Sequence, residues 1–379
     1  MRVCYFGTYD QQYPRNRIII EGLQANGVQV DECHIPLWRD TEDKIAAASG
    51  GWSRIRFLAR VLGSYARLIS QHGPALRQYD LVMLGYSGQI DTLIAKPLAR
   101  LLGKPVVLDL FVSIYLAATE RGLNVAHPRT VGAIHWFEKR ACKLSDLLFL
   151  DTPAYADFFH ETYGISRDKL KTIPLGANER IFFPVPCDVR DKAFQVLYFG
   201  KYIPLHGIPT ILDAANLLKG ERNVQFRMHG KGQLKASALA QAEALDLQNV
   251  TFTDWVADPT KLSEEFAPYE VVLGAFGDTA AARMTIQNKI YEGMAMRKVV
   301  ITRDTPTVRS AFNDGEHLVL CPHDDPGALA EAIIRLRDDP DRCRYIAENG
   351  YRIFTAHYTT EAVGRVAKQY LEELLGYAS

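Results

Sequence analysis

The stretch "GKYIPLHGIP", which begins at Gly200, combines residue types that bind anions. It follows an apolar run, "FQVLYF", and passes through Lys201, His206 and Gly207 to Pro209, which suits the first turn of a helix. Backbone N–H groups at a helix N-terminus have no partner and lie at the positive end of the helix dipole. With Lys201 and His206 beside them, they predict a diphosphate site. The alternative is a plain connection whose glycines only permit tight turns.

A second group of polar residues opens another expected helix, in "GAFGDTAAARMTIQNKIYEG" from Gly274. Lys289 and the first N–H groups of a helix beginning near Gln287 suit a phosphate, and Glu292 suits the two hydroxyls of a ribose. The alternative is a solvated pair of Lys289 and Glu292 at i, i+3, which stabilises a helix by only about 0.2–0.5 kcal/mol. The spacing leaves both interpretations open.

A third turn, "HGKGQL", follows an apolar run at Gly230. Its glycines would let the backbone approach a nucleobase or a phosphate, although a hairpin-like turn explains them about as well. Neither this turn nor "YFGTYD", near the beginning of the chain, has the G-x-G-x-x-G spacing of a nicotinamide site.

The first half of the chain offers fewer chemical groups. Its first apolar run ends at Gly7, and Tyr13, Arg15 and Asn16 follow at the start of an expected helix. There they are predicted to face a cleft and meet a second anion or a sugar, the alternative being a capped, solvated helix start. Asp109 ends another apolar run, an unfavourable place for a charge unless a ligand or a single structural hydrogen bond uses it.

These residues lie at the ends of apolar runs that alternate with amphipathic segments along the whole chain. Such runs predict buried parallel strands separated by helices. They are "RVCYFG", "LVMLGYS", "PVVLDLF" and "LLFLDT", then "FQVLYFG", "VQFRMHG", "NVTFTDW", "YEVVLGAFG" and "KVVIT". The pattern predicts an α/β protein of two doubly wound halves, joined near 184–191 and facing each other across one cleft. Ligands of such sheets bind beyond the carboxyl ends of the strands.

Length and composition indicate the number of domains, the kinds of partner and the cellular compartment. A chain of 379 residues usually forms two domains. Lys+Arg and Asp+Glu are both 44, so the net charge does not suggest a nucleic-acid partner. The six cysteines have no CxxC spacing, and no signal-peptide pattern or long apolar run is present, which together predict a cytoplasmic protein with reduced thiols.

One segment suggests contact with a membrane. Residues 44–79 contain six cations and no Asp or Glu, interleaved with Trp52, Phe57, Tyr65 and several aliphatic residues. A basic amphipathic helix of this kind can lie on the inner, anionic face of a membrane. The alternative is a helix that packs its apolar side on a sheet and leaves its arginines in water. A lipid-linked acceptor would fit the membrane interpretation.

Together the motifs resemble family 4 of the retaining, nucleotide-sugar-dependent glycosyltransferases, the glycosyl transferases group 1. The resemblance covers nearly the whole chain and rests on residues 137–184, which contain "IPLGAN", on "NKIYEGMAMRKVVIT" and on "GYRIFTAHYT". It implies the GT-B fold, two Rossmann-like domains facing across a cleft, with a C-terminal helix crossing back to the first. The implied domains are residues 1–185 for the acceptor, 186–356 for the donor and 357–379 for the closing helices.

The resemblance also implies roles for individual residues. Lys201 stands where the family often has a diphosphate-binding arginine, and His206 where it usually has a lysine. Glu292 matches the ribose-binding second glutamate of an E-x7-E pattern, whereas Met284 replaces the first glutamate. The chain thus resembles a branch in which "FGD" and "NKIYE" replace the usual loop and Lys289 supplies phosphate charge. The donor-binding residues implied are Gly200, Lys201, His206, Gly207, Gly230, Phe276, Gly277, Asn288, Lys289, Ile290 and Glu292.

The implied activity is retaining transfer of a sugar from a nucleotide-sugar to a glycan or lipid-linked acceptor, without a metal or other cofactor. Lys201 and Lys289 are the expected catalytic cations because they would stabilise the leaving diphosphate. Asp109 is expected to orient the acceptor or the sugar. Two alternatives stay open: a nucleotide-sugar isomerase or phosphorylase that uses the same cleft, and a non-catalytic nucleotide-sugar binding protein, which the loss of the glutamate at Met284 would suit.

Overall fold

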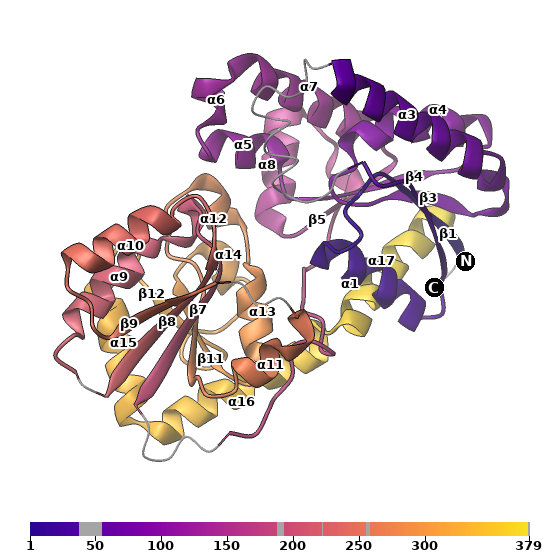
Figure 1. Cartoon of the computed structure of the whole chain (residues 1–379). Coiled ribbons are helices and arrows are strands. Elements are labelled where there is room, and N and C mark those ends of the chain that lie inside the picture. Colours follow the sequence, from indigo (N-terminus) through magenta and orange to yellow (C-terminus); the bar gives the residue numbers. More distant parts are fainter. Residues whose placement is uncertain (38–54, 188–192, 222, 255–257, 378–379) are drawn as a thin grey trace. The chain divides into compact units, whose positions relative to one another are not determined.

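The chain forms two compact units, shown in Figure 1. The computed structural model describes residues 1–37, 55–187, 193–221, 223–254 and 258–377. The first unit contains Met1–Leu175 and Thr360–Ser379, and the second contains Gly176–Thr359. The chain therefore leaves the first unit at Leu175 and returns at Thr360, whereas the predicted domains divide at 185/186 and 356/357.

The first unit is built on a parallel sheet of six strands in the order β2-β1-β3-β4-β5-β6. Its central strands are buried along nearly their whole length, as expected for a parallel sheet covered on both faces. The strands are β1 (Arg2–Gly7), β2 (Gln29–His34), β3 (Leu81–Leu84), β4 (Val106–Phe111), β5 (Leu147–Leu150) and β6 (Leu170–Thr172).

Helices cover both faces of this sheet (Figure 1). They are α1 (Pro14–Ala25), α3 (Ile55–His72), α4 (Gln89–Leu101), α5 (Ile114–Glu120), α6 (Leu123–Ala126), α7 (Pro128–Leu144), α8 (Pro153–Tyr163) and α17 (Thr360–Leu375). The last of these packs against α1 where two glycines meet. A Cβ added to Gly364 would lie 2.0 Å from the carbonyl carbon of Gly22, so only glycines allow this approach. Among the described residues, no helix is both long and apolar enough to cross a membrane.

The second unit repeats the design with a parallel sheet in the order β12-β11-β10-β7-β8-β9. Its strands are β7 (Phe194–Lys201), β8 (Val224–Lys231), β9 (Val250–Thr253), β10 (Val271–Leu273), β11 (Val299–Arg303) and β12 (Val319–Cys321). Its helices are α9 (Ile208–Leu217), α10 (Lys235–Ala244), α11 (Leu262–Glu265), α12 (Ala280–Met284), α13 (Asn288–Ala295), α14 (Pro306–Arg309), α15 (Pro326–Asp338) and α16 (Pro340–His357). Figure 1 shows α9, α10 and α15 on one side of the sheet and α13 and α16 on the other.

The prediction of two doubly wound α/β halves is confirmed. Every apolar run quoted above contains a strand, and the two helices that carry the anion-binding motifs begin at Ile208 and Asn288, close to the predicted starts. Three strands escaped prediction: β2, β6 and β12. All three lie at sheet edges, where one side of a strand has no neighbour and continuous apolar character is not required.

Each sheet has one point at which the strand order changes direction. In the first unit β1 lies between β2 and β3, and in the second unit β7 lies between β8 and β10. The connections that follow the two strands at such a point run to opposite sides and leave a crevice at their carboxyl ends. These ends are the residues after Gly7 and Leu84 in the first unit, and those after Lys201 and Leu273 in the second.

Candidate functional site

The central feature of the second unit's crevice is a buried cation. Lys289, in the first turn of α13, is only 4% exposed, yet its ammonium makes no hydrogen bond or ion pair with any described residue. It lies 4.9 Å from the centre of the Tyr198 ring, with which it makes a cation–π contact. Burial lowers the pKa of Lys289 to about 7, against a weaker opposing effect of Glu292. An unpaired buried ammonium is unfavourable unless a ligand anion joins it.

Strand β7 lies directly against the side chain of Lys289 through Gly200. A Cβ added to Gly200 would lie 3.3 Å from Cε and 3.4 Å from Nζ of Lys289, so the glycine leaves room for the lysine. The φ angle of Gly200 is 137°, a conformation that other residues rarely adopt. Gly230, on the paired strand β8, has φ 139°, and a Cβ there would meet the carbonyl oxygen of Gly200 at 1.9 Å. Both glycines are therefore required for the backbone geometry at this edge.

The imidazole of His206 lies beside two oxygen atoms at the end of β7. Its Nδ1 lies 2.5 Å from the carbonyl oxygen of Lys201 and 2.8 Å from the Tyr198 hydroxyl, which itself donates to the same carbonyl. Burial, followed by the charge of Lys289, holds the pKa of His206 well below its usual range. The two oxygen neighbours and the lowered pKa favour the neutral imidazole, so the role of His206 at a diphosphate stays a prediction.

Glu292 completes the polar part of the crevice one turn along α13. Its carboxylate also lacks a hydrogen bond or ion pair among the residues that the structure describes. Burial raises the pKa of Glu292 to about 7, against the opposing charge of Lys289. The alternative of a solvated Lys289/Glu292 ion pair is thus excluded, since Lys289 is buried and the two groups do not form a salt bridge.

Two glycines hold the facing loops together. Gly207, with φ 62°, begins α9, and a Cβ there would lie 2.4 Å from the carbonyl carbon of Phe276. A Cβ at Gly277 would lie 2.2 Å from the carbonyl oxygen of Pro204. The backbone N–H of Phe276 donates to the His206 carbonyl at 3.1 Å. The loop after β7 and the loop after β10 are therefore one packed structure.

The other predicted donor residues lie around the same edge. Lys201 is exposed at the end of β7, and Asn288 is half-buried at the start of α13. Ile290 and Phe276 are 0% and 3% exposed and belong to the core, so only their backbone atoms are available to a ligand. Tyr198, which joins Lys289, Lys201 and His206, was not predicted. Its position two residues before Gly200 places it on the same face of β7, which was the only signal in the sequence.

The "FGD" loop ends in a charged cluster. Asp278 accepts two hydrogen bonds from Arg283, each of 2.9 Å, and one of 2.7 Å from Arg303, and His323 lies 3.0 Å away. Arg303 also donates to the carbonyl oxygen of Gly277. These contacts lower the pKa of Asp278, with the hydrogen bond from Arg283 as the first cause. These contacts fix the loop after β10.

In the first unit the structure corrects two predictions. Arg15 and Asp109 are both fully buried and form an ion pair, with Nε of Arg15 2.9 Å from Oδ2 of Asp109. Arg15 also donates to the carbonyl oxygens of Ile173 and Pro174. Arg15 therefore does not face an open cleft, and Asp109 does not orient a substrate, because their charges are used to join α1, β4 and the segment after β6.

Asn16 is likewise structural rather than exposed to a ligand. Its amide nitrogen donates to the carbonyls of Asp10 and Tyr86, and its amide oxygen accepts from the Tyr86 N–H. Gly7, with φ 140°, makes room for Asp91, whose Oδ2 would lie 2.3 Å from an added Cβ. Of the four residues predicted for this side, Tyr13 alone keeps a half-buried side chain at the crevice.

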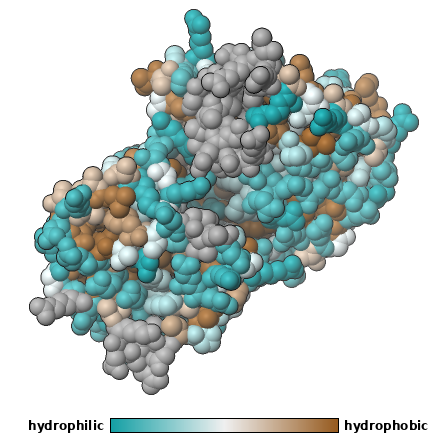
Figure 2. Space-filling view, viewed as in Figure 1, coloured by the Kyte–Doolittle hydropathy of each residue, from teal (hydrophilic) through white to brown (hydrophobic). Residues whose placement is uncertain are grey.

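The basic segment 44–79 is described only in part. Residues up to 54 and the side chains of 55–58 lie outside the described residues, Trp52 and Phe57 among them. Within α3, Tyr65 and Leu68 are buried, whereas Leu62 is 70% exposed and Ile69 37%. Figure 2 shows hydrophobic and hydrophilic side chains interspersed over α3 and α4. The helix thus packs one side on the unit and leaves apolar and basic residues outside.

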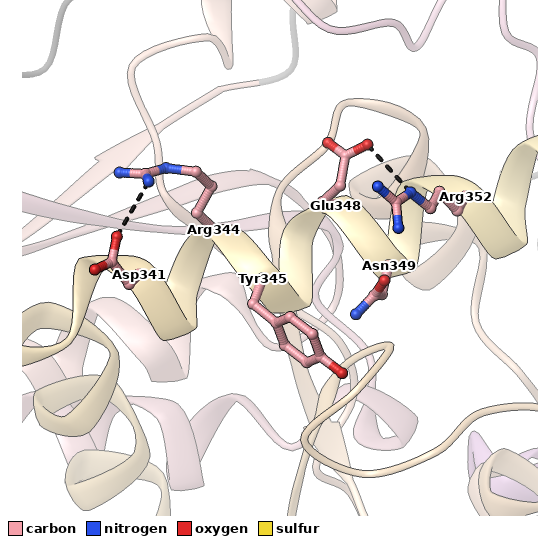
Figure 3. Close-up of a pocket in the computed structure, with 6 residues that line it drawn as sticks. All are labelled: Asp341, Arg344, Tyr345, Glu348, Asn349 and Arg352. Atoms are coloured by element: carbon pink, nitrogen blue, oxygen red, sulfur yellow. Dashed lines mark hydrogen bonds and ion pairs between the residues drawn. The ribbon is translucent and has the colours of Figure 1, made fainter.

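A shallow depression on α16 is a weaker candidate for a site (Figure 3). Asp341 lies 3.1 Å from Arg344, and Glu348 lies 3.5 Å from Arg352, so its charges are paired along one exposed helix. The depression is lined by Asp341, Arg344, Tyr345, Glu348, Asn349 and Arg352. It contains no group that a ligand is needed to satisfy.

Comparison with known proteins points to glycosyl transfer. Residues 193–339 match the model of a family described as glycosyl transferases group 1. Among curated relatives, the alpha-D-kanosaminyltransferase of Streptomyces kanamyceticus is 24% identical over 285 residues, covering 70% of this chain and 70% of the relative. The MMP alpha-(1->4)-mannosyltransferase of Mycolicibacterium hassiacum is 24% identical over 265 residues, covering 68% of this chain and 60% of the relative. The named relatives are thus glycosyltransferases.

Solved structures establish the fold. Sucrose-phosphate synthase from Thermosynechococcus elongatus superimposes with a TM-score of 0.73 at 17% identity, covering 100% of both chains. Anabaena HepE in complex with UDP-glucose superimposes with a TM-score of 0.68 at 15% identity, covering 98% of this chain and 100% of that one. The two Rossmann-like sheets have the GT-B architecture, as predicted.

Proposed function

We propose that this protein is a retaining glycosyltransferase that moves a sugar from a nucleotide-sugar to a glycan or lipid-linked acceptor. The observation that carries the proposal is the buried, unpaired ammonium of Lys289 at the point where the strand order of the second unit reverses. A diphosphate placed there would supply the missing negative charge. The names of the relatives and of the matched family support glycosyl transfer as the reaction.

The residues around Lys289 suggest how a donor would be held. The diphosphate would lie between Lys289, Lys201 and the first turn of α9, at the positive end of that helix's dipole. Glu292 would accept hydrogen bonds from the ribose hydroxyls. UDP and UDP-glucose bind to the structural relative HepE, which makes a uridine nucleotide the first candidate to test.

In the proposed reaction the bond between the anomeric carbon and the β-phosphate oxygen breaks, and the diphosphate leaves with the bonding electron pair. The acceptor hydroxyl attacks the anomeric carbon from the same face, and its proton passes to an oxygen of the leaving diphosphate. Lys289 and Lys201 stabilise the negative charge that develops on the leaving group. Holding both substrates together provides much of the remaining rate advantage.

We further propose that the reaction needs no metal. Transfer should then persist in excess chelator, which is checked by an assay in EDTA.

We also propose that the first unit touches a membrane through residues 44–79. The exposed Leu62, Ile69 and Arg67 of α3 suit the surface of an anionic bilayer. Replacing Arg67 by Glu should weaken cosedimentation with phosphatidylglycerol vesicles and leave the protein's behaviour with phosphatidylcholine vesicles unchanged.

The proposal is tested by thermal shift with UDP, GDP, ADP and CMP and their sugars, followed by transfer assays with the sugar that binds. A nucleotide at about 100 times its dissociation constant should add roughly 2.7 kcal/mol of stability. The shift should be lost in Glu292→Ala and Lys289→Ala. If no nucleotide shifts the unfolding temperature, the donor site is wrong.

Two other functions are separated by simple observations. A nucleotide-sugar isomerase would convert its substrate without an acceptor, and a phosphorylase would require free phosphate. A non-catalytic binding protein would give the thermal shift but release no nucleotide when acceptors are added. Nucleotide release that depends on an acceptor therefore supports the transferase.

A further inference from the structure

Helix α16 packs one side on the second unit and leaves the opposite side in solvent. Its buried residues are Ile346, Ala347, Gly350 and Phe354. The residues of the opposite side follow each other at spacings of three and four, which places them in one stripe along the helix. They are Asp341, Arg344, Tyr345, Glu348, Asn349 and Arg352, which line the shallow depression. Figure 3 shows the charged side chains along one edge of this stripe, with Tyr345 and Asn349 along the other.

The charges of this stripe alternate in sign along the helix. From the N-terminus they read negative, positive, negative and positive, at Asp341, Arg344, Glu348 and Arg352. The side chains of Asp341, Arg344 and Arg352 are 90%, 77% and 71% exposed. Ion pairs as exposed as those within this helix contribute at most about 1 kcal/mol each. The stripe therefore has no net charge, and its charged atoms are open to a partner.

A row of alternating charges is complementary to its own reverse. When a second copy lies antiparallel along the first, its row reads positive, negative, positive and negative, so opposite charges meet. With a twofold axis midway between Ile346 and Ala347, Asp341 lies level with Arg352 of the second copy. Arg344 then lies within the rise of one residue, about 1.5 Å, of Glu348 of the second copy. A parallel copy in the same register would place like charges together, which is unfavourable.

The uncharged edge of the stripe obeys the same symmetry. Tyr345 lies within the rise of one residue of Asn349 of the second copy, and a phenol and a side-chain amide can form a hydrogen bond. The Tyr345 ring is exposed, and the Arg342 guanidinium lies 5.2 Å from its centre. Tyrosine and arginine are enriched at protein interfaces, whereas lysine is depleted there and does not occur in the stripe.

The carboxylate nearest the axis is already fixed in the single chain. Glu348 lies 3.4 Å from Arg297, which follows α13, and 3.5 Å from Arg352. The guanidinium of Arg297 in turn lies 4.5 Å from the centre of the Tyr351 ring. A side chain that is already held in place loses less entropy when a partner binds.

We propose that this stripe is the interface of a twofold-symmetric dimer, in which α16 of a second copy of this chain lies antiparallel along it. Such an interface requires a surface that is complementary to itself, and the stripe is one. Six residues from each copy are fewer than a standard interface has, so the dimer is weak, with a dissociation constant on the order of 10–100 µM. The dimer does not depend on the transferase function, because the stripe contains no donor-binding residue.

The test measures the mass of the full chain by sedimentation equilibrium, at concentrations from about 1 to 500 µM. The average mass should rise from that of one chain toward twice that value. Asp341→Arg and Arg352→Asp each place like charges together at both ends of the interface, so each should weaken the dimer at least about tenfold. Glu331→Arg is the matched control, because it removes an exposed i, i+4 pair with Arg335 on α15 and should leave the mass unchanged.

Two combinations of these changes distinguish the dimer from charges that serve only their own helix. The two single variants mixed in equal amounts should dimerise again, because every contact between the changed positions is then Arg with Asp. The double variant Asp341→Arg/Arg352→Asp should also recover the dimer, although it places like charges beside Arg344 and Glu348 within the helix. A chain that stays monomeric, a dimer that neither single variant weakens, or no recovery in either combination would overturn the proposal.

Discussion

The two crevices differ in whether their buried charged side chains have an ion-pair partner. In the first unit, Arg15 and Asp109 are 0% exposed and neutralise each other, and two backbone carbonyls accept hydrogen bonds from Nη1 of Arg15. In the second unit, Lys289 is equally deep and has no such partner among the described residues. A charge at a strand end is therefore not itself a sign of a ligand. The sign is a buried charge that the protein leaves uncompensated.

The largest expected effect comes from breaking the compensated pair. Asp109→Asn should lower the free energy of unfolding of the first unit by about 3–5 kcal/mol, because Arg15 is left buried without its partner. Urea denaturation followed by a probe in that unit measures this. Asp341→Asn, which breaks the exposed pair with Arg344, is the control and should cost at most about 1 kcal/mol. A stable Asp109→Asn protein that cannot transfer sugar would mean that Asp109 does touch substrate.

Lys289→Met should have effects of opposite sign on stability and binding. At pH 6 the unliganded variant should unfold at a higher temperature, because no ammonium has to be buried. Nucleotide affinity should fall roughly 10- to 100-fold, the value of a charge-assisted hydrogen bond. Thermal shift and calorimetric titration measure the two quantities, with the exposed Lys261→Met as control. Loss of both stability and affinity would identify Lys289 as a structural residue.

Glycine substitutions compare the two units at matched backbone angles. Gly27 has φ 76° and open space around it. Gly27→Ala should therefore lower the free energy of unfolding by about 1–2 kcal/mol, because alanine must adopt a left-handed conformation there. Gly207 has φ 62°, and a Cβ there would clash with the Phe276 backbone. Gly207→Ala should therefore lower the free energy of unfolding by about 1 kcal/mol more than Gly27→Ala does, and should also reduce nucleotide affinity. Equal losses from the two variants, with unchanged affinity, would show that the loop contact does not shape the donor site.

The last expected effect is the pH dependence of diphosphate binding. The ammonium form of Lys289 binds the anion, and its pKa in the unliganded protein is about 7, so above pH 7 binding must be accompanied by proton uptake. Affinity for UDP should then fall by up to about tenfold per pH unit between pH 7 and 9. Glu292 titrates near the same pH, so the measurement is made in Glu292→Gln. Adding Lys289→Met should abolish the slope; a slope that persists belongs to another group.

The sequence predicted the strands of both sheets better than it predicted which charged residues at the strand ends have an ion-pair partner. Buried central strands such as β1, β4 and β7 appear as continuous apolar runs, whereas the edge strand β2, "QVDECH", has one side without a neighbour and no such run. Lys289 was found because it lies in a local motif. The pairing of Arg15 with Asp109 was not, since 94 positions separate the two residues and only the fold brings them together.

The return of the chain to its first unit constrains the order of folding during synthesis. Residues 176–359 are an uninterrupted stretch that can fold once they have been made, whereas α1 receives its partner helix only after Thr360. At roughly 5–20 residues per second, the ribosome needs about 10–40 s to bridge that interval. During this time the narrow glycine surface of α1 around Gly22 is uncovered. The second unit, although later in the sequence, is therefore the first to be complete on the nascent chain.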